Sequence, residues 1–446
     1  MHLIFENLVP NLIKHWTGEF KGLDEGREEY EFKGAGKVWE ALGRDTAETG
    51  KTMPSAFGAR VPNIEKDRSN MSAEMWSIWT LYIGPVLLQR RFTRPKYYKH
   101  FVELVRLLHI CLQFEITHDE IADLRQGFQD WVAKYEKYYY QHNPERVSAC
   151  PLTIHALLHI ADSIEFMGPV WCYWAFPMER YCGTLTPAIK TRRFPYASLD
   201  RYVVERAQLE QINAIYDVAP EMSLRPHHKK IPRGAYAPID VAYSTCILLP
   251  PKADSPVSHS ALDSITSALA TRLDMRVQDI RPHVRNAQIV RYGRVRRVDS
   301  DEGDTIRAVQ SAASREDSRE ASYVRYEMYE DRHKRSKRKK VDLDLKTFFG
   351  ELQTIFVVRF HDPVAVTALK LGDNTEIVLA AIRACEISKS HDVLDIHYYM
   401  RDGQLDVVDV TSIQALVGRI KDEGQWAIVD RSGALARAVF DSGSDQ

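Results

Sequence analysis

The sequence predicts a mixed α and β protein, with an all-helical module in its first half and a small β-rich domain at its C-terminal end. The helical prediction rests on apolar residues that recur at helical spacing between residues 69 and 142. The β prediction rests on short runs after Phe348, such as "LQTIFVVRF" and "LDVVDV", which Asp, Gly and Asn residues separate. Between these parts the chain is first rich in proline and then densely charged.

The helical module carries start and stop signals as well as periodicity. Thr117 and Glu120 form a capping-box pattern in front of a long apolar stripe. Pro85 should bend or end an earlier helix, because proline lacks the backbone N–H that a helix interior needs. Two further helices are expected, at 152–165 and 199–216.

Composition divides the chain into three parts. Residues 1–217 form the first part. Residues 218–345 are interpreted as a connector, because prolines are frequent in its first half and charges dominate the second, which leaves little material for a core. A short helix is expected within it near 261–275. Residues 346–446 form the β-rich domain, either a partly open barrel or a sandwich.

Charge and cysteine content exclude several classes of protein. Sixty Lys and Arg residues against 61 Asp and Glu residues leave the net charge near zero, so any nucleic-acid affinity must come from local clusters. Six cysteines without a CxxC pair favour a reduced intracellular protein. The N-terminal stretch has no signal-peptide pattern. The longest apolar run, at 75–88, is too short to span a bilayer, so we expect no membrane partner.

One carboxylate lies in an unusually apolar stretch, "GPVWCYWAFPMERYCG" at 168–183. Glu179 follows two tryptophans and a phenylalanine, where removing an ionised carboxylate from water is costly unless a cation pairs with it. Arg180 need not be that cation, because consecutive side chains of a helix diverge. The alternative is a structural role, in which Glu179 starts a helix after Pro177 and is favoured by the helix dipole.

His155 and His159 are four residues apart in "TIHALLHIAD", which places both rings on one helical face. That spacing suits two ligands of one metal ion, although the Glu of the HExxH zinc motif is absent. The spacings to Cys150, Cys172 and Cys182 match no standard zinc pattern. The alternative is that both rings pack in a helical core with their hydrogen bonds satisfied. The pair is therefore a metal-ligand candidate without a complete motif.

Two basic clusters are candidates for phosphate contacts or nuclear import. The first, "RPHVRNAQIVRYGRVRR" at 281–297, has no acidic residue, and arginine forks suit phosphate oxygens. Its candidate nucleic-acid contacts are Arg281, Arg285, Arg291, Arg294, Arg296 and Arg297. The alternative is solvated charge beside the acidic segment 299–304. The second cluster, "RHKRSKRKK" at 332–340, is typical of a nuclear-import signal or a phosphate-contacting arm. Its candidate import residues are Lys334, Arg335, Lys337, Arg338, Lys339 and Lys340.

Four stretches resemble the C-terminal half of CACTA-type (En/Spm-like) DNA transposases, in the form common in mushroom-forming fungi. They are "MHLIFENLVPNLIKHWTGEFKGLD", "PLTIHALLHIAD", "GPVWCYWAFPMERYCGTL" and "WAIVDRSGALARAVF". The similarity extends over nearly the whole chain. The first three stretches are fairly specific, whereas the last belongs to a C-terminal region for which the resemblance supplies no role.

The resemblance implies an RNase H-like core in which three acidic residues hold two divalent metal ions, usually Mg²⁺. Glu179 corresponds to the third acid, on the helix that follows a large helical insertion at about 20–165, and Glu165 is the weaker alternative for that position. His2 matches the His that follows another of the acids. Both remaining acids would precede Met1. The resemblance therefore implies a core that lacks two of its three metal ligands and half of its sheet. The first twenty residues of the chain are then expected to pack poorly.

The leading functional hypothesis is a truncated or domesticated transposase remnant that is catalytically inactive. Such a remnant retains DNA binding through the basic clusters, or binds a protein partner or a second copy through the helical module. One alternative is the distal part of an intact nuclear transposase that uses Mg²⁺ and whose start lies upstream. Another is a non-enzymatic interaction scaffold. The expected location is nuclear, or cytoplasmic if 332–340 is not an import signal.

Overall fold

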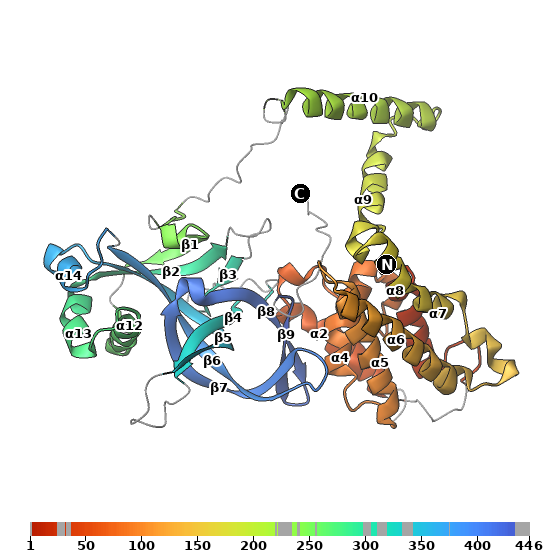
Figure 1. Ribbon diagram of the computed structural model, residues 1–446, viewed down its shortest axis with the longest axis horizontal. Helices are drawn as coiled ribbons and strands as arrows, with labels where there is room; N and C mark the ends of the chain where they lie inside the picture. The colour runs from red at the N-terminus through yellow and green to blue at the C-terminus, as the bar shows by residue number, and fades with distance from the viewer. Residues whose placement is uncertain are drawn as a thin grey trace.

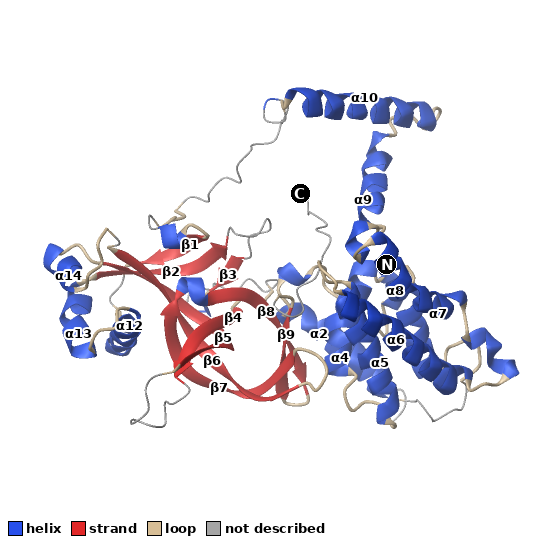
Figure 2. Ribbon diagram, viewed as in Figure 1, coloured by secondary structure: helices blue, strands red, loops and turns tan. Residues whose placement is uncertain are grey.

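The fold combines a helical part and a β part, which confirms the prediction of a mixed α and β protein. A computed structural model describes residues 2–24, 32, 37–218, 221, 234–238, 241–254, 257–297, 305–309, 319–331, 342–373 and 375–432. The helices up to α10 precede all the strands in the chain, and the two parts pack side by side (Figure 1). A group of short helices lies at the end of the β part that faces away from the helical part (Figure 2). No helix among the described residues is long and apolar enough to cross a membrane.

The helical part is assembled from helices joined by short 3₁₀ and π turns. Its α-helices are α1 (Val9–Trp16), α2 (Lys37–Thr52), α3 (Ala73–Ile78), α4 (Gly84–Leu87), α5 (Pro95–Cys111), α6 (His118–Tyr135), α7 (Leu152–Ala156), α8 (Ile160–Met167), α9 (Phe176–Leu185) and α10 (Pro195–Tyr216). The predicted capping box is confirmed, since Glu120 N donates to Thr117 Oγ1 at 3.3 Å and Thr117 N donates to Glu120 Oε2 at 2.8 Å. The chain is helical from Ala73 to Leu87, and Pro85 lies just after a π-helical turn at Trp79–Ile83 changes to α4, so the helical hydrogen-bond pattern changes beside the proline.

The core of the helical part is unusually aromatic and includes the start of the chain. The largest side chains that it buries completely are Trp16, Trp79, Trp131, Tyr82, Tyr97, Tyr135 and Tyr139. Trp16 on α1 donates its indole N–H to the Tyr139 hydroxyl at 2.9 Å. The expectation that the first twenty residues pack poorly is therefore wrong, because the apolar face of α1 lies inside the helical module rather than against a sheet.

A buried ionic network links three separate segments of the helical part. The Asp24 carboxylate contacts His15 Nδ1 at 2.6 Å and accepts a hydrogen bond from Arg146 at 2.6 Å. Arg146 also donates to the backbone carbonyls of Leu23 and Tyr139. All three charged or titratable side chains are at most 3% exposed. Desolvation lowers the pKa of His15, although the nearby Asp24 acts in the opposite direction.

Among the described residues, nine antiparallel strands form the β part, and six of them close into a barrel. The strands are β1 (Cys246–Ala253), β2 (Gln288–Arg297), β3 (Thr305–Arg307), β4 (Tyr323–Asp331), β5 (Leu343–Arg359), β6 (Glu376–Ser390), β7 (Ile396–Asp409), β8 (Ile413–Asp422) and β9 (Gln425–Asp430). The pairing order β4-β5-β6-β7-β9-β8 returns to β4 through the β4–β8 ladder. The second half of the long strand β5 pairs with β2, which also carries β1 and β3. The barrel is thus closed rather than partly open.

The strands begin well before the β-rich domain that the sequence predicts at 346–446. Strands β1 to β4 lie within 218–345, which was expected to be a connector. The expected short helix near 261–275 is present as α12 (His259–Arg272). It is followed by α13 (Val277–Asn286), and α14 (Pro363–Ala368) connects β5 to β6.

One side chain from each barrel strand meets in a common cluster, which fills the barrel. These residues are Tyr323, Phe349, Cys385, Tyr399, Val417 and Ile428. Arg419 of β8 lies over the rings of Tyr323 and Trp426 and donates to the Tyr399 hydroxyl at 2.6 Å. Glu320, just before β4, accepts a bidentate pair of hydrogen bonds from this guanidinium. The buried arginine is therefore both neutralised and stacked.

The two parts share one hydrophobic core. Side chains of β7 to β9 and the turn before β7 join the helical cluster, namely Leu394, Ile396, Tyr398, Ile420, Ala427 and Val429. The backbone N–H of Glu320 donates to the carbonyl of Lys51 at 2.9 Å. By contrast, α9 and α10 project away from both parts (Figure 1), and α10 has no buried side chain.

Candidate nucleic-acid interface

Helices α12 and α13 form a compact helix-turn-helix pair on one face of the sheet. The four residues 273–276 connect them, and Asp274 has a φ of +50° in that turn. Their inner faces bury Ile265, Leu269, Ile280 and Val284 against strands β5 and β6. Because these side chains are fully packed, the outer face of α13 has a fixed orientation.

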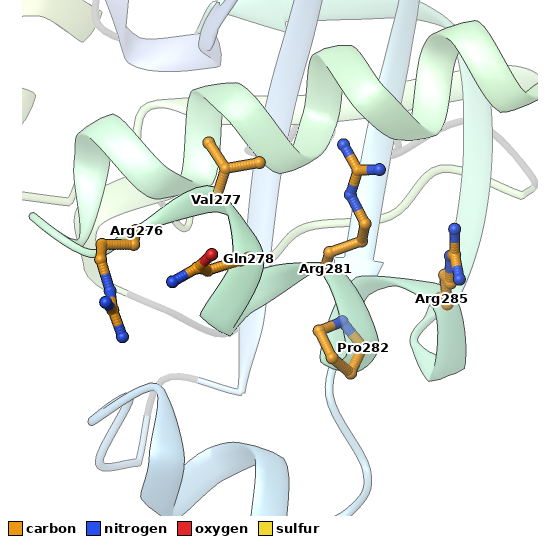
Figure 3. A pocket seen from close by; sticks show the side chains of 6 residues that line it. All are labelled: Arg276, Val277, Gln278, Arg281, Pro282 and Arg285. Carbon is orange, nitrogen blue, oxygen red and sulfur yellow. The ribbon is translucent and has the colours of Figure 1, made fainter.

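The outer face of α13 is basic and hollowed. Gln278, Arg281, Pro282 and Arg285 follow one another at helical spacing, so they share a face. With Arg276 and Val277 they line an open hollow of about 590 Å³ (Figure 3). Three of the six lining residues are arginines and none is acidic. We call this set of six residues the α13 surface.

Acidic neighbours neutralise the α13 surface only in part. Arg276 forms a hydrogen-bonded pair with Asp279, and Arg281 lies 3.2 Å from Asp263. Both pairs are exposed, and exposed ion pairs contribute little free energy. Arg285 makes no hydrogen bond or ion pair to any residue that the structure describes. The guanidinium groups of Arg281 and Arg285 are thus available to an external anion.

The structure separates the six arginines of the first basic cluster into two groups. Arg281 and Arg285 are exposed on α13, whereas the other four lie on β2 and are half-buried. Three β2 arginines donate to oxygen acceptors within the protein. Arg294 bonds the carbonyl of Pro250, Arg296 bonds the Thr305 hydroxyl, and Arg297 bonds the carbonyls of Ile413 and Gln414. These contacts favour a structural role for the β2 arginines.

Sequence reasoning missed four members of the α13 surface, of which two are polar, Arg276 and Gln278. Both precede the acid-free run at 281–297, and the adjacent Asp279 interrupts the basic character. Helical spacing would have found Gln278, since it lies three residues before Arg281 and seven before Arg285. Arg276 is the N-cap residue of α13 and has no such spacing.

Glu179 lies in a second candidate site, beside the start of the chain. It is in the first turn of α9, with Pro177 at the helix start, as the structural alternative expects. Its carboxylate is also 2.9 Å from Nε2 of His2, whose Nδ1 contacts Glu6. The hydrogen bond with Glu6 raises the pKa of His2, with a smaller contribution from Glu179. Two positions that the resemblance matches through separate motifs therefore touch each other.

This second site does not match the metal centre that the resemblance implies. No group of three His, Cys, Asp or Glu side chains within the described ranges is arranged to hold a metal ion. The carboxylate of Glu165, the weaker alternative, pairs with Arg125 at 2.5 Å. The residues present thus do not fit a site for two Mg²⁺ ions.

The remaining candidates are two histidines and the import segment. The Nε2 atoms of His155 and His159 lie 3.1 Å apart on an exposed surface, and the rings are not in the core. Residues 332–340, with the candidate import residues, lie outside the described residues. Cys111, Cys150, Cys172, Cys182 and Cys385 are free thiols.

Comparison with known proteins identifies no relative of this chain. No protein-family model, curated protein or solved structure matches it.

Proposed function

We propose that the chain is a catalytically incomplete relative of CACTA-type transposases that binds DNA through α13 and enters the nucleus through 332–340. The observation that supports the kinship is the contact between His2 and Glu179. These residues are 177 positions apart, and their side chains lie within hydrogen-bond distance, at 2.9 Å. The resemblance places both residues in one catalytic centre. His2 corresponds to the His that follows one of the acids, and Glu179 corresponds to the third acid.

We expect this chain by itself to lack transposase activity, because no group of three His, Cys, Asp or Glu side chains in its described part is arranged to hold a metal ion. Phosphoryl transfer by two ions needs several carboxylates to fix the ions about 3.5–4 Å apart. The test mixes the purified chain with Mg²⁺ or Mn²⁺ and DNA that carries the terminal repeats of a CACTA-type element. We expect a sequencing gel to show no cleavage and no strand transfer. Metal-dependent cleavage that Glu179→Gln abolishes would contradict this part of the proposal.

The α13 surface suits duplex DNA, because the DNA backbone presents phosphates at short, regular intervals. Three guanidinium groups along one short helix provide forked donors for phosphate oxygens. The net charge of the whole chain is −1, so the attraction must come from this surface and not from the overall field. Such binding is expected to be weakly sequence-specific and strongly dependent on salt.

Replacing Arg281 and Arg285 with alanine should weaken DNA binding and reduce its dependence on salt. Each lost phosphate contact lowers the slope of log affinity against log salt by about 0.9 for duplex DNA, so the double variant should lose about 1.8. Fluorescence anisotropy with a labelled duplex, at several salt concentrations, measures this slope.

The matched control removes two exposed arginines from other surfaces, Arg44 on α2 and Arg401 on β7. This variant changes the net charge equally, and its slope should stay as in the unmodified protein. Arg294→Ala should also leave the slope unchanged and lower stability instead, by about 1–3 kcal/mol, because the Pro250 carbonyl loses its donor. Equal slopes for the Arg281 and Arg285 variant and its control would rule out α13 as the DNA contact.

A second candidate function, protein binding, is favoured by the exposed apolar residues of α9 and α10. Met178 is 66% exposed, Leu209 51% and Ile215 65%, and apolar side chains of this size seldom gather on a free surface. A complex with a protein partner, together with no salt-dependent affinity for DNA, would favour an interaction scaffold over the DNA-binding proposal.

A further inference from the structure

The pair His155 and His159 has the geometry of a metal chelate. His155 is in α7 and His159 ends the 3₁₀ turn Leu157–His159 that follows. Their Nε2 atoms are 3.1 Å apart, with ring centroids at 4.9 Å and ring planes inclined by 75°. Both side chains are exposed, so an ion can reach them from solvent.

The separation of the two nitrogens matches the edge of a metal coordination shell. Metal–imidazole bonds of about 2.0–2.1 Å place two nitrogens about 3.4 Å apart at adjacent corners of a tetrahedron, and about 2.9 Å apart in a square plane. The observed 3.1 Å lies between these values. An ion can therefore bind both nitrogens with only small movements of the rings.

Packing fixes the backbone beneath the two rings. Ile154 and Leu157, on the opposite side of the same helical segment, are at most 3% exposed and belong to the helical core. The Ser163 hydroxyl donates to the carbonyl of His159 at 2.8 Å. Because the backbone is already ordered, metal binding has to order only the two imidazole rings.

We propose that His155 and His159 form a surface site for one divalent transition-metal ion, of the class of Zn²⁺ and Cu²⁺. Neutral imidazole is a good ligand for these ions and a poor one for Mg²⁺. Two neutral rings share one hydrogen bond at most between these nitrogens, whereas a metal ion accepts an electron pair from each. No third ligand completes a group within the described residues, so water occupies the other coordination positions.

Isothermal titration with ZnCl₂ tests the site in a background in which His227 and His228, an adjacent pair elsewhere in the sequence, are replaced by alanine. We expect one Zn²⁺ per chain, tighter binding of CuCl₂, in line with the usual metal order, and no binding of MgCl₂. His155→Ala and His159→Ala should each lower the Zn²⁺ affinity at least tenfold. His118→Ala removes an exposed histidine that has no second histidine four residues away in the sequence. This control should leave the Zn²⁺ affinity unchanged.

Either of two results would overturn the site. One is a background protein that takes up no Zn²⁺ at millimolar concentration. The other is Zn²⁺ binding that survives in the His155→Ala and His159→Ala double variant, which would assign it to other groups such as the exposed thiols of Cys172 and Cys182. Thermal unfolding of each variant without metal checks that the helical part remains folded.

Discussion

Replacing Asp24 with alanine should lower the free energy of unfolding by about 3–5 kcal/mol, the usual cost of removing one partner from a buried ion pair. Asp24 is fully buried and contacts both His15 and Arg146. Without its carboxylate, the buried Arg146 guanidinium loses its ion pair with Asp24, although the backbone carbonyls of Leu23 and Tyr139 still accept hydrogen bonds from it. Chemical denaturation followed by tryptophan fluorescence measures the loss, because Trp16 lies close to this network.

Two further variants separate the lost charge pair from general damage. Asp24→Asn keeps the shape and one acceptor oxygen, so it should fold and still be less stable than the unmodified protein. Arg146→Met removes the charge that Asp24 neutralises. The double variant with Asp24→Ala and Arg146→Met should therefore lose less stability than the sum of the two single losses. Asp67→Ala, at an exposed aspartate, should change stability by no more than about 0.5 kcal/mol. Equal unfolding midpoints for Asp24→Ala and Asp67→Ala would show that the network does not stabilise the fold.

The helices could be predicted because their signals are local. The capping box at Thr117 and Glu120 involves residues three apart, and the structure has it as expected. The expected helices at 152–165 and 199–216 correspond to α7, α8 and α10. Such signals need no knowledge of distant parts of the chain.

The barrel could not be predicted because its strands pair over long distances and carry many charges. Strand β4 lies in a segment that was interpreted as a charged connector, yet its Arg325 lies 3.2 Å from the buried Asp430 of β9. The sequence alone does not distinguish a charged side chain that a distant residue neutralises from one that faces solvent. Closure of the barrel depends on the β4–β8 ladder, which no local pattern announces.

The candidate sites show the same limit. The acid-free run at 281–297 was interpreted as one phosphate-binding cluster, but it contains the end of α13 and the whole of β2. Val290 and Val295, which lie in the core, are the apolar residues that mark the strand. Sequence cannot tell an arginine that binds a backbone carbonyl, such as Arg297, from one that faces solvent, such as Arg285.

Acidification below about pH 6.5 should destabilise the helical part through His100. This ring is 3% exposed, stacks on Trp131 at 4.2 Å between centroids, and has Nε2 placed 3.1 Å from the Trp131 carbonyl oxygen. Burial lowers the pKa of His100 to about 3. In the unfolded chain a histidine titrates near pH 6.5, so between these values the unfolded state binds one more proton than the folded state. Stability is therefore complete above about pH 6.5 and falls as the pH decreases.

The expected contribution of His100 is about 1.4 kcal/mol for each pH unit below 6.5, or about 2–3 kcal/mol at pH 4.5. His15, whose pKa burial also lowers, acts in the same direction. Denaturation curves at several pH values give the slope of the free energy of unfolding against pH. In His100→Phe, which cannot titrate and preserves the aromatic stacking, this slope should be smaller by the equivalent of about one proton. His118→Phe, at an exposed site, should keep the full slope. If the slopes of both variants equal that of the unmodified protein, carboxylates and not His100 determine the acid sensitivity of the fold.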